Sequence, residues 1–112
     1  MKQVTAIIRP QRLGPVRDAL IRAGVRGMTL TEVRGFGQQT GTVEEYQGVQ
    51  YHVDYVPKFK IELVVSDGQL DDTVNAIIAA AHTGSIGDGK IWVTAVDAVY
   101  RIRTGDRDQS AL

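Results

Sequence analysis

The chain has 112 residues, 43% hydrophobic and 23% charged, which predicts a single folded domain over 1–112 with no stretch disordered by composition. Its 13 basic and 13 acidic residues balance, so net charge gives no reason to expect nucleic acid or an anionic membrane as a partner. The absence of cysteine excludes disulfides and thiolate chemistry, and the first residues lack a signal-peptide core, so we expect a cytoplasmic protein.

The first half of the chain predicts a strand, a helix and a second strand. Residues 3–9 alternate between two faces with the period of a strand. Gly14-Pro15 resembles a helix start, and apolar residues follow at helical spacing as far as Gly24. Residues 27–36 are rich in β-branched side chains and predict a second strand.

The second half repeats this plan. Residues 58–65 predict a third strand, a second helix runs from about Ser66-Asp67 to Thr83-Gly84, and residues 90–103 hold one strand or two. The order predicts an α+β, ferredoxin-like βαββαβ fold with two helices on one face of an antiparallel sheet. Because two helices cannot cover both faces, we expect sister subunits to cover the other in a closed cyclic oligomer.

The connection between the second and third predicted strands, residues 37–55, is far longer than a hairpin needs. It carries three of the four tyrosines, and long connections in small domains are usually functional. Alternatively, part of it extends the two strands as a long ribbon. In either case the tip is expected to project.

A glycine-rich stretch, Thr83–Lys90, contains the pattern G-x-x-x-x-G-K. It is no P-loop, because Ile91 replaces the magnesium-binding hydroxyl and the stretch precedes a strand instead of a helix. Its glycines nevertheless let backbone N–H groups approach an anion, and Lys90 adds a positive charge. The alternative is a helix cap followed by a tight turn.

Tyr100–Arg103 strengthens the case for an anion. In an extended segment, alternation would place Arg101 and Arg103 on one face, where a phosphate chain would neutralise both guanidinium groups. The alternative is a pair of solvated arginines beside Asp106 and Asp108.

Two smaller signals concern the ligand and the chemistry. Gly35-Phe36-Gly37 could bring backbone close to the same anion, and Gln39 offers an oxygen to magnesium. His52 and His82 lack metal-ligand spacing, and no nucleophile motif is present, so no catalytic residue is assigned.

Across its whole length the sequence resembles the PII family of nitrogen-signalling proteins. The resemblance is carried by these stretches: 6–10, 24–29, 34–37, 53–54, 57–58, 83–84, 86–90 and 101–105. It implies a homotrimer with ATP or ADP in clefts between subunits. The implied segments are a signalling loop over 37–55, a nucleotide loop over 82–90 and a C-terminal segment over 102–112.

The resemblance also implies roles for individual residues. The base and ribose are expected beside Ile7, Thr29, Phe36 and Val64. Gly35 and Gly37 are also expected to contact the nucleotide, and Gln38 to lie near its terminal phosphate. The phosphates are expected at Gly87, Asp88, Gly89, Lys90, Arg101 and Arg103. The effector 2-oxoglutarate, bound beside MgATP, is expected at Gln39, Thr40, Gly41, Lys58 and Gly87, with Gln39 as the magnesium ligand.

The output implied by the resemblance is the shape of the long loop. Members dock it onto ammonium channels, nitrogen-metabolism enzymes or regulatory kinases, so contact with a membrane would come only through a channel partner. A nucleotidylyltransferase could modify Tyr51, although its neighbours differ from the usual context. Gln38 stands where many members have a basic residue, and we expect weaker discrimination between ATP and ADP.

Two other classes of protein share some of these features. A small phosphate-handling enzyme on the same fold could also use glycine turns and arginines, and it would show turnover. An RNA-binding module is disfavoured, because the strands lack a cluster of exposed aromatic residues and the charge is balanced.

Overall fold

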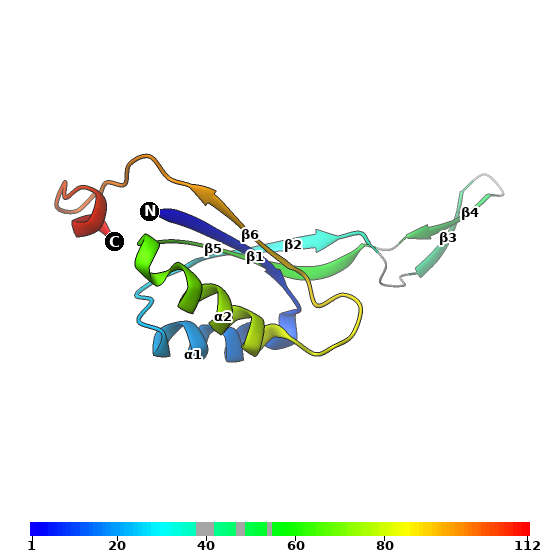
Figure 1. Cartoon of the computed structure of the whole chain (residues 1–112). Coiled ribbons are helices and arrows are strands. Elements are labelled where there is room, and N and C mark those ends of the chain that lie inside the picture. The colour runs from blue at the N-terminus through cyan, green and yellow to red at the C-terminus, as the bar shows by residue number, and fades with distance from the viewer. Residues whose placement is uncertain (38–41, 47–48, 54) are drawn as a thin grey trace.

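The computed structural model describes residues 1–37, 42–46, 49–53 and 55–112. Four antiparallel strands form one sheet in the order β2-β5-β1-β6, with bounds β1 Lys2–Ile8, β2 Thr29–Gly35, β5 Val56–Val65 and β6 Lys90–Ala95. Two helices, α1 Leu13–Arg22 and α2 Leu70–Ala81, lie together on one face of this sheet (Figure 1). The predicted α+β arrangement of sheet and helices is therefore confirmed.

Helix α1 begins and ends as its sequence predicts. A short 3-10 helix, Pro10–Arg12, leads into it, and Pro15 sits in its first turn, where a missing N–H costs nothing. At the other end Gly24 has φ +88°, and the Val25 N–H donates to the Leu20 carbonyl at 3.0 Å. This Schellman closure uses the left-handed conformation that glycine adopts readily.

Helix α2 follows a 3-10 turn at Asp67–Gln69 and stops at Ala81, because His82 is already extended. Its buried Thr73 hydroxyl donates to the Gln69 carbonyl at 2.8 Å, so burying that polar group leaves it satisfied. Within the described ranges, neither this helix nor α1 has the length and apolar character needed to cross a membrane.

The core lies between the helices and the sheet. Register pairs Val4 with Leu63 and Ala6 with Ile61, so alternate residues of β1 and β5 face the helices. The buried apolar set comprises Val4, Ala6, Ile8, Val16, Leu20, Ile61, Leu63, Val65, Ile77 and Ala81. Burial of this face holds both helices on the sheet.

The opposite sheet face is largely polar. It carries Gln3, Thr5 and Ile7 of β1, and no described helix packs against it (Figure 1). Across β1 and β5, the Gln3 amide donates to Glu62 at 2.8 Å. Strands β2 and β6 are the two edges of the described sheet.

The stretch predicted as a loop over 37–55 contains a hairpin. Strands β3 Thr42–Tyr46 and β4 Val49–Val53 pair antiparallel in a sheet of their own. Among the described residues this hairpin is a sheet separate from the one that holds β2 and β5, and Figure 1 draws it beyond the end of those strands. Residues 38–41, 47–48 and 54 lie outside the described residues.

The expectation of an extended segment at Tyr100–Arg103 is wrong. Strand β6 ends at Ala95, and the chain turns back at residues 101–105. Gly105, at φ +73°, donates its N–H to the Arg101 carbonyl at 2.7 Å, which closes the turn. The strand alternation that would have aligned Arg101 with Arg103 therefore does not apply.

Candidate functional site

A cleft of about 590 Å³ lies where the glycine-rich stretch crosses the end of the sheet. Its walls come from β1, β6, the junction of β2 and β5 with the hairpin, and the segment after α2. The lining residues are Ile7, Gly35, Phe36, Gly37, Val56, Lys58, Ile86, Gly87, Gly89, Lys90 and Trp92. Eight of these, all except Val56, Ile86 and Trp92, were predicted as ligand residues from the sequence.

The glycine loop fits closely over β1. Gly87 and Gly89 have φ of +103° and +101°, a conformation that residues with a side chain rarely adopt. A Cβ atom at Gly89 would stand 1.7 Å from the Ile7 carbonyl oxygen. These glycines therefore serve a close backbone crossing as well as the turn itself.

The Asp88 carboxylate closes the loop from inside. It accepts hydrogen bonds from the Thr83 N–H at 2.8 Å and the Gly84 N–H at 2.9 Å, and also from the Thr83 hydroxyl. These bonds, the Thr83 hydroxyl first and then the Thr83 N–H and Arg9, hold the pKa of Asp88 well below its usual range. The predicted phosphate residue Asp88 thus uses its side chain to shape the loop.

Arg9, at the end of β1, clamps the same loop. Its Nε lies 3.0 Å from Asp88 Oδ1, and its Nη2 donates to the Ile86 carbonyl at 2.7 Å. The guanidinium fork can hold both acceptors at once. No role was predicted for Arg9, although a basic residue directly after a buried strand and before Pro10 was a visible signal.

Lys58 is the buried cation of the cleft. Only 8% of the residue is exposed, and its Nζ donates to the Gly87 carbonyl at 2.5 Å. Burial is the main cause that lowers the pKa of Lys58; Arg9 lowers it further, and Asp88 opposes the shift. A cation held this way is positioned to meet an anion that reaches Gly87.

The cleft reaches the root of the hairpin through two aromatic residues. Phe36 lines the cleft, and its ring centroid lies 5.9 Å from that of Tyr55, which directly precedes β5. Since Gly35 pairs with Val56, the two rings flank the point where the chain leaves and rejoins the sheet. The cleft therefore extends to the point from which the segment holding β3 and β4 departs.

Two predicted base-contacting residues lie elsewhere. Thr29 and Val64 line a second hollow of about 470 Å³, together with Gly27, Met28 and Glu62. Val64 pairs with Gln3, four residues from Ile7 along β1, or roughly 13 Å at the rise of a strand. Within a single chain, the predicted base-contacting residues therefore do not meet at one site.

Arg101 and Arg103 do not line the cleft either. Arg101 donates to the Leu112 carbonyl at 3.1 Å, and Arg103 is exposed on the C-terminal turn. Gln38, Gln39, Thr40 and Gly41 lie outside the described residues. Tyr51 lies on β4, opposite Glu44 in the hairpin register.

The cleft is suited to binding an anion. A glycine loop, the buried Lys58 and a second lysine, Lys90 on β6, bring backbone and two positive charges to one concavity, as phosphate sites require. Among the residues that the structure describes, no three histidine or carboxylate side chains gather as a metal cluster. The cations of the cleft suit a phosphate-bearing or carboxylate-bearing ligand.

Comparison with known proteins decides the family. A family model described as "Nitrogen regulatory protein P-II" matches residues 1–106. The chain belongs to the P-II family. The resemblance read from the sequence is thereby confirmed.

Relatives in the P-II family match the chain from end to end. The Nitrogen regulatory protein P-II of Synechocystis sp. is 54% identical over 112 residues, covering all of both chains. The protein of the same name from Pasteurella multocida is 52% identical, and Nitrogen regulatory protein GlnK of Escherichia coli is 50% identical, each over the full length of both chains. P-II membership makes this chain a nitrogen regulatory protein of the signalling type.

Proposed function

We propose that the protein senses nitrogen, carbon and energy status by binding ATP or ADP at the cleft and, with MgATP, 2-oxoglutarate. Its output is regulation of target proteins, such as an ammonium channel or nitrogen-metabolism enzymes, through residues 37–55. It acts by binding rather than by turnover, and it works in the cytoplasm as a homotrimer. Tyr51 is the proposed target of a nucleotidylyltransferase.

One observation carries this proposal: the anion-binding loop and the hairpin root share one cleft. Gly87, Gly89 and Lys90 line it on one side, and Gly35–Gly37 line it on the other. A nucleotide whose phosphates lie against the loop would therefore touch the residues from which the hairpin departs. Ligand identity would set the conformation of the segment that partners read.

The predicted ligand residues are divided between the cleft and the second hollow, and this division supports the proposed trimer. Lys90 lies on edge strand β6 and Thr29 on the opposite edge strand, β2. A cyclic assembly that brings β6 of one copy to β2 of the next would unite the cleft of one copy with the second hollow of its neighbour. Arg101 and Arg103 would come from the neighbour as well.

Lys58 is the residue that supports the proposed effector site. Its ammonium group already engages the Gly87 carbonyl at 2.5 Å, so a carboxylate at this place would meet a positioned, poorly solvated cation. Gln39 and the nucleotide phosphates would hold magnesium, which would orient the effector. The other proposed contacts come from Thr40 and Gly41.

Calorimetry tests the proposed sensing. ATP, ADP and MgATP are titrated with and without 2-oxoglutarate, and we expect 2-oxoglutarate to tighten MgATP binding and not ADP binding. Nucleotide binding without this coupling would reduce the protein to a nucleotide sensor, and no binding would overturn the proposal. Phosphate release is followed in the same samples, and turnover lost in Arg103→Ala would favour an enzyme instead.

Mixed assemblies test the composite cleft. Lys90→Ala impairs the loop side, and Arg103→Ala impairs the side expected from the neighbour. Each variant alone should lose tight ATP binding, whereas mixed trimers, refolded together, should regain it at clefts that pair two intact halves. If the mixture binds no better than either variant, the site is contained within one chain.

A further inference from the structure

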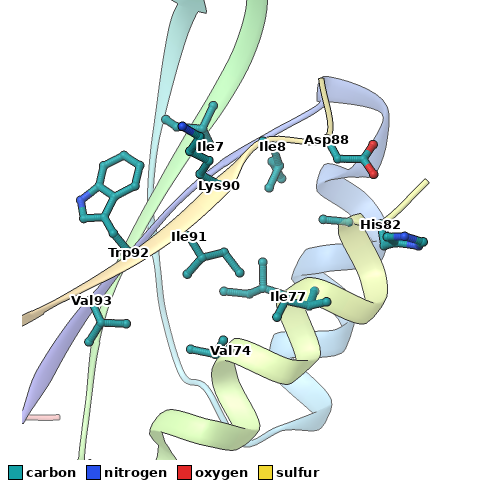
Figure 2. Close-up of a pocket in the computed structure, with 13 residues that line it drawn as sticks. Ile7, Ile8, Val74, Ile77, His82, Asp88, Lys90, Ile91, Trp92 and Val93 are labelled. Carbon is teal, nitrogen blue, oxygen red and sulfur yellow. The ribbon is translucent and has the colours of Figure 1, made fainter. Parts of the chain in front are cut away.

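Trp92 is the one tryptophan of the chain, and no ligand role was assigned to it. It lies on β6, two residues after Lys90, and it is 45% exposed. Strand alternation places it on the sheet face away from the helices, the same face as Lys90. Figure 2 shows Trp92, Ile7 and Lys90 on that side, while Ile91 points toward α2.

The neighbours of Trp92 place it in the cleft wall. In the β1–β6 register Ile7 is opposite Lys90, and Thr5 is opposite Trp92. Ile7 and Trp92 are therefore diagonal neighbours, within reach of a large aromatic side chain. Both line the cleft, so one apolar wall is built from an aliphatic and an aromatic residue.

The cleft has two chemically different parts. Gly87, Gly89 and Lys58 present backbone and a cation to an anion, whereas Ile7 and Trp92 present apolar surface. A polyphosphate gains nothing from an indole, but a purine base gains from stacking on its face. A second, mostly apolar groove of about 440 Å³ lies between β6 and α2, and it shares Trp92, Ile7, Gly89 and Lys90 with the cleft.

We propose that Trp92 is the aromatic wall of the cleft, against which the base of the bound nucleotide lies while the phosphates face the glycine loop. This inference rests on the proposed nucleotide binding and assigns it a specificity residue. Its 45% exposure leaves part of the side chain accessible to a ligand in the cleft. Trp92 would thereby favour nucleotides over simple phosphates.

Intrinsic fluorescence of the full-length protein tests the contact, because Trp92 is the single indole reporter. ATP and adenosine should both change the emission, adenosine at a higher concentration. Inorganic tripolyphosphate should bind without that change. An equal response to tripolyphosphate and ATP would overturn the base contact, because it would show that the indole senses only the phosphates or a general rearrangement.

Variants test the energetics by calorimetry. Trp92→Phe keeps a π face and should bind ATP within about 3-fold of the wild type. Trp92→Leu keeps apolar bulk without a π face and should weaken ATP binding about 10- to 100-fold, with tripolyphosphate binding unchanged. Thr94→Ala is the matched control, because Thr94 lies on the same face of β6 and outside the cleft.

The outcomes separate the two proposals. If wild type binds no nucleotide, the proposed function fails and Trp92 loses its ligand. If wild type binds ATP but Trp92→Leu binds it equally well, the function stands and the role of Trp92 is refuted. Light scattering checks that each variant keeps its assembly; if Trp92→Leu does not, wild-type fluorescence and Trp92→Phe still decide the question.

Discussion

The backbone of Gly89 crosses Ile7 so closely that a Cβ at residue 89 would stand 1.7 Å from the Ile7 carbonyl oxygen. The crossing holds the glycine loop against β1 at the residue that also lines the cleft. Gly89 is therefore needed for two reasons: its φ of +101°, and the lack of space for a side chain at the crossing. The shape of the site depends on this contact between two segments of the main chain.

We therefore expect Gly89→Ala to lower both stability and nucleotide affinity. Strained φ and displacement of the Ile7 backbone should together cost about 2 kcal/mol or more. Thermal unfolding at fixed protein concentration and ATP calorimetry measure the two effects. Gly14→Ala is the control: nothing lies within 4 Å of its Cβ position, and a helical alanine should be neutral or slightly stabilising. Equal behaviour of both variants would contradict this account.

Arg9 and Asp88 should act on the loop as a unit. Each of Arg9→Gln and Asp88→Asn removes one partner of the 3.0 Å ion pair, and each should lower the thermal midpoint. The double variant should lower it by less than the sum, because the second change removes an interaction already lost. Strict additivity would show that Arg9 acts only through its carbonyl acceptors, Ile86 at 2.7 Å and Ser85 at 3.5 Å.

The same carboxylate predicts a pH dependence. The pKa of Asp88 is depressed in the folded protein, chiefly by the Thr83 hydroxyl, so its stabilising effect is present above the unfolded value near 3.8. It is lost as the pH falls through the lower folded pKa. The stability gap between wild type and Asp88→Asn should therefore be constant around neutral pH and shrink below 3.8. A gap that stays constant in acid would mean that the charge is unimportant.

The regular elements were predictable because each is built on one repeating pattern. Alternation in β1 and β5 and helical spacing around Val16 and Leu20 reflect burial against a single core, and the structure places those residues there. Eight cleft residues were predicted through glycine chemistry and family resemblance. For the strands and helices, local sequence sufficed because the physical cause was local or periodic.

The failures share a different cause. The turn at 101–105 depends on the φ of Gly105 and on the pairing of Tyr100 with Arg107, and neither follows from alternation. The Arg9 clamp joins residues 79 positions apart, so no motif spacing contains it. Trp92 was overlooked as a cleft residue because its position follows from the β1–β6 register.

The contact between Phe36 and Tyr55 should link the cleft to the hairpin root. Their ring centroids are 5.9 Å apart, while only Phe36 lines the cleft. Tyr55→Leu removes the aromatic partner without touching the lining, and it should weaken ATP binding about 2- to 5-fold by freeing Phe36. Tyr55→Phe keeps the ring and should bind like the wild type in calorimetry. Wild-type affinity in both variants would show that the pair carries no coupling.

Lys58 should control binding of the effector. Binding of the nucleotide in the absence of effector should be nearly unaffected when Lys58 is replaced. Its ammonium group is buried and bound to the Gly87 carbonyl at 2.5 Å, where the proposed 2-oxoglutarate carboxylate arrives. Lys58→Gln should abolish the tightening of MgATP binding by 2-oxoglutarate while ATP affinity without effector changes by less than about 5-fold. Calorimetry with and without effector separates these outcomes, and coupling retained in Lys58→Gln would contradict the assignment.

The charge state of Lys58 gives this assignment a second test. Burial, and then Arg9, lower the pKa of Lys58 below 10.5, and the carboxylate binds the charged form. As the pH rises through that lowered pKa the charged fraction falls, so 2-oxoglutarate affinity should begin to fall at a lower pH than an ordinary lysine would give. Lys58→Arg stays charged, and any binding it retains should be insensitive to alkaline pH. If 2-oxoglutarate affinity falls identically at alkaline pH in wild type and Lys58→Arg, another group titrates. Lys58 would then not be the cation that binds the carboxylate.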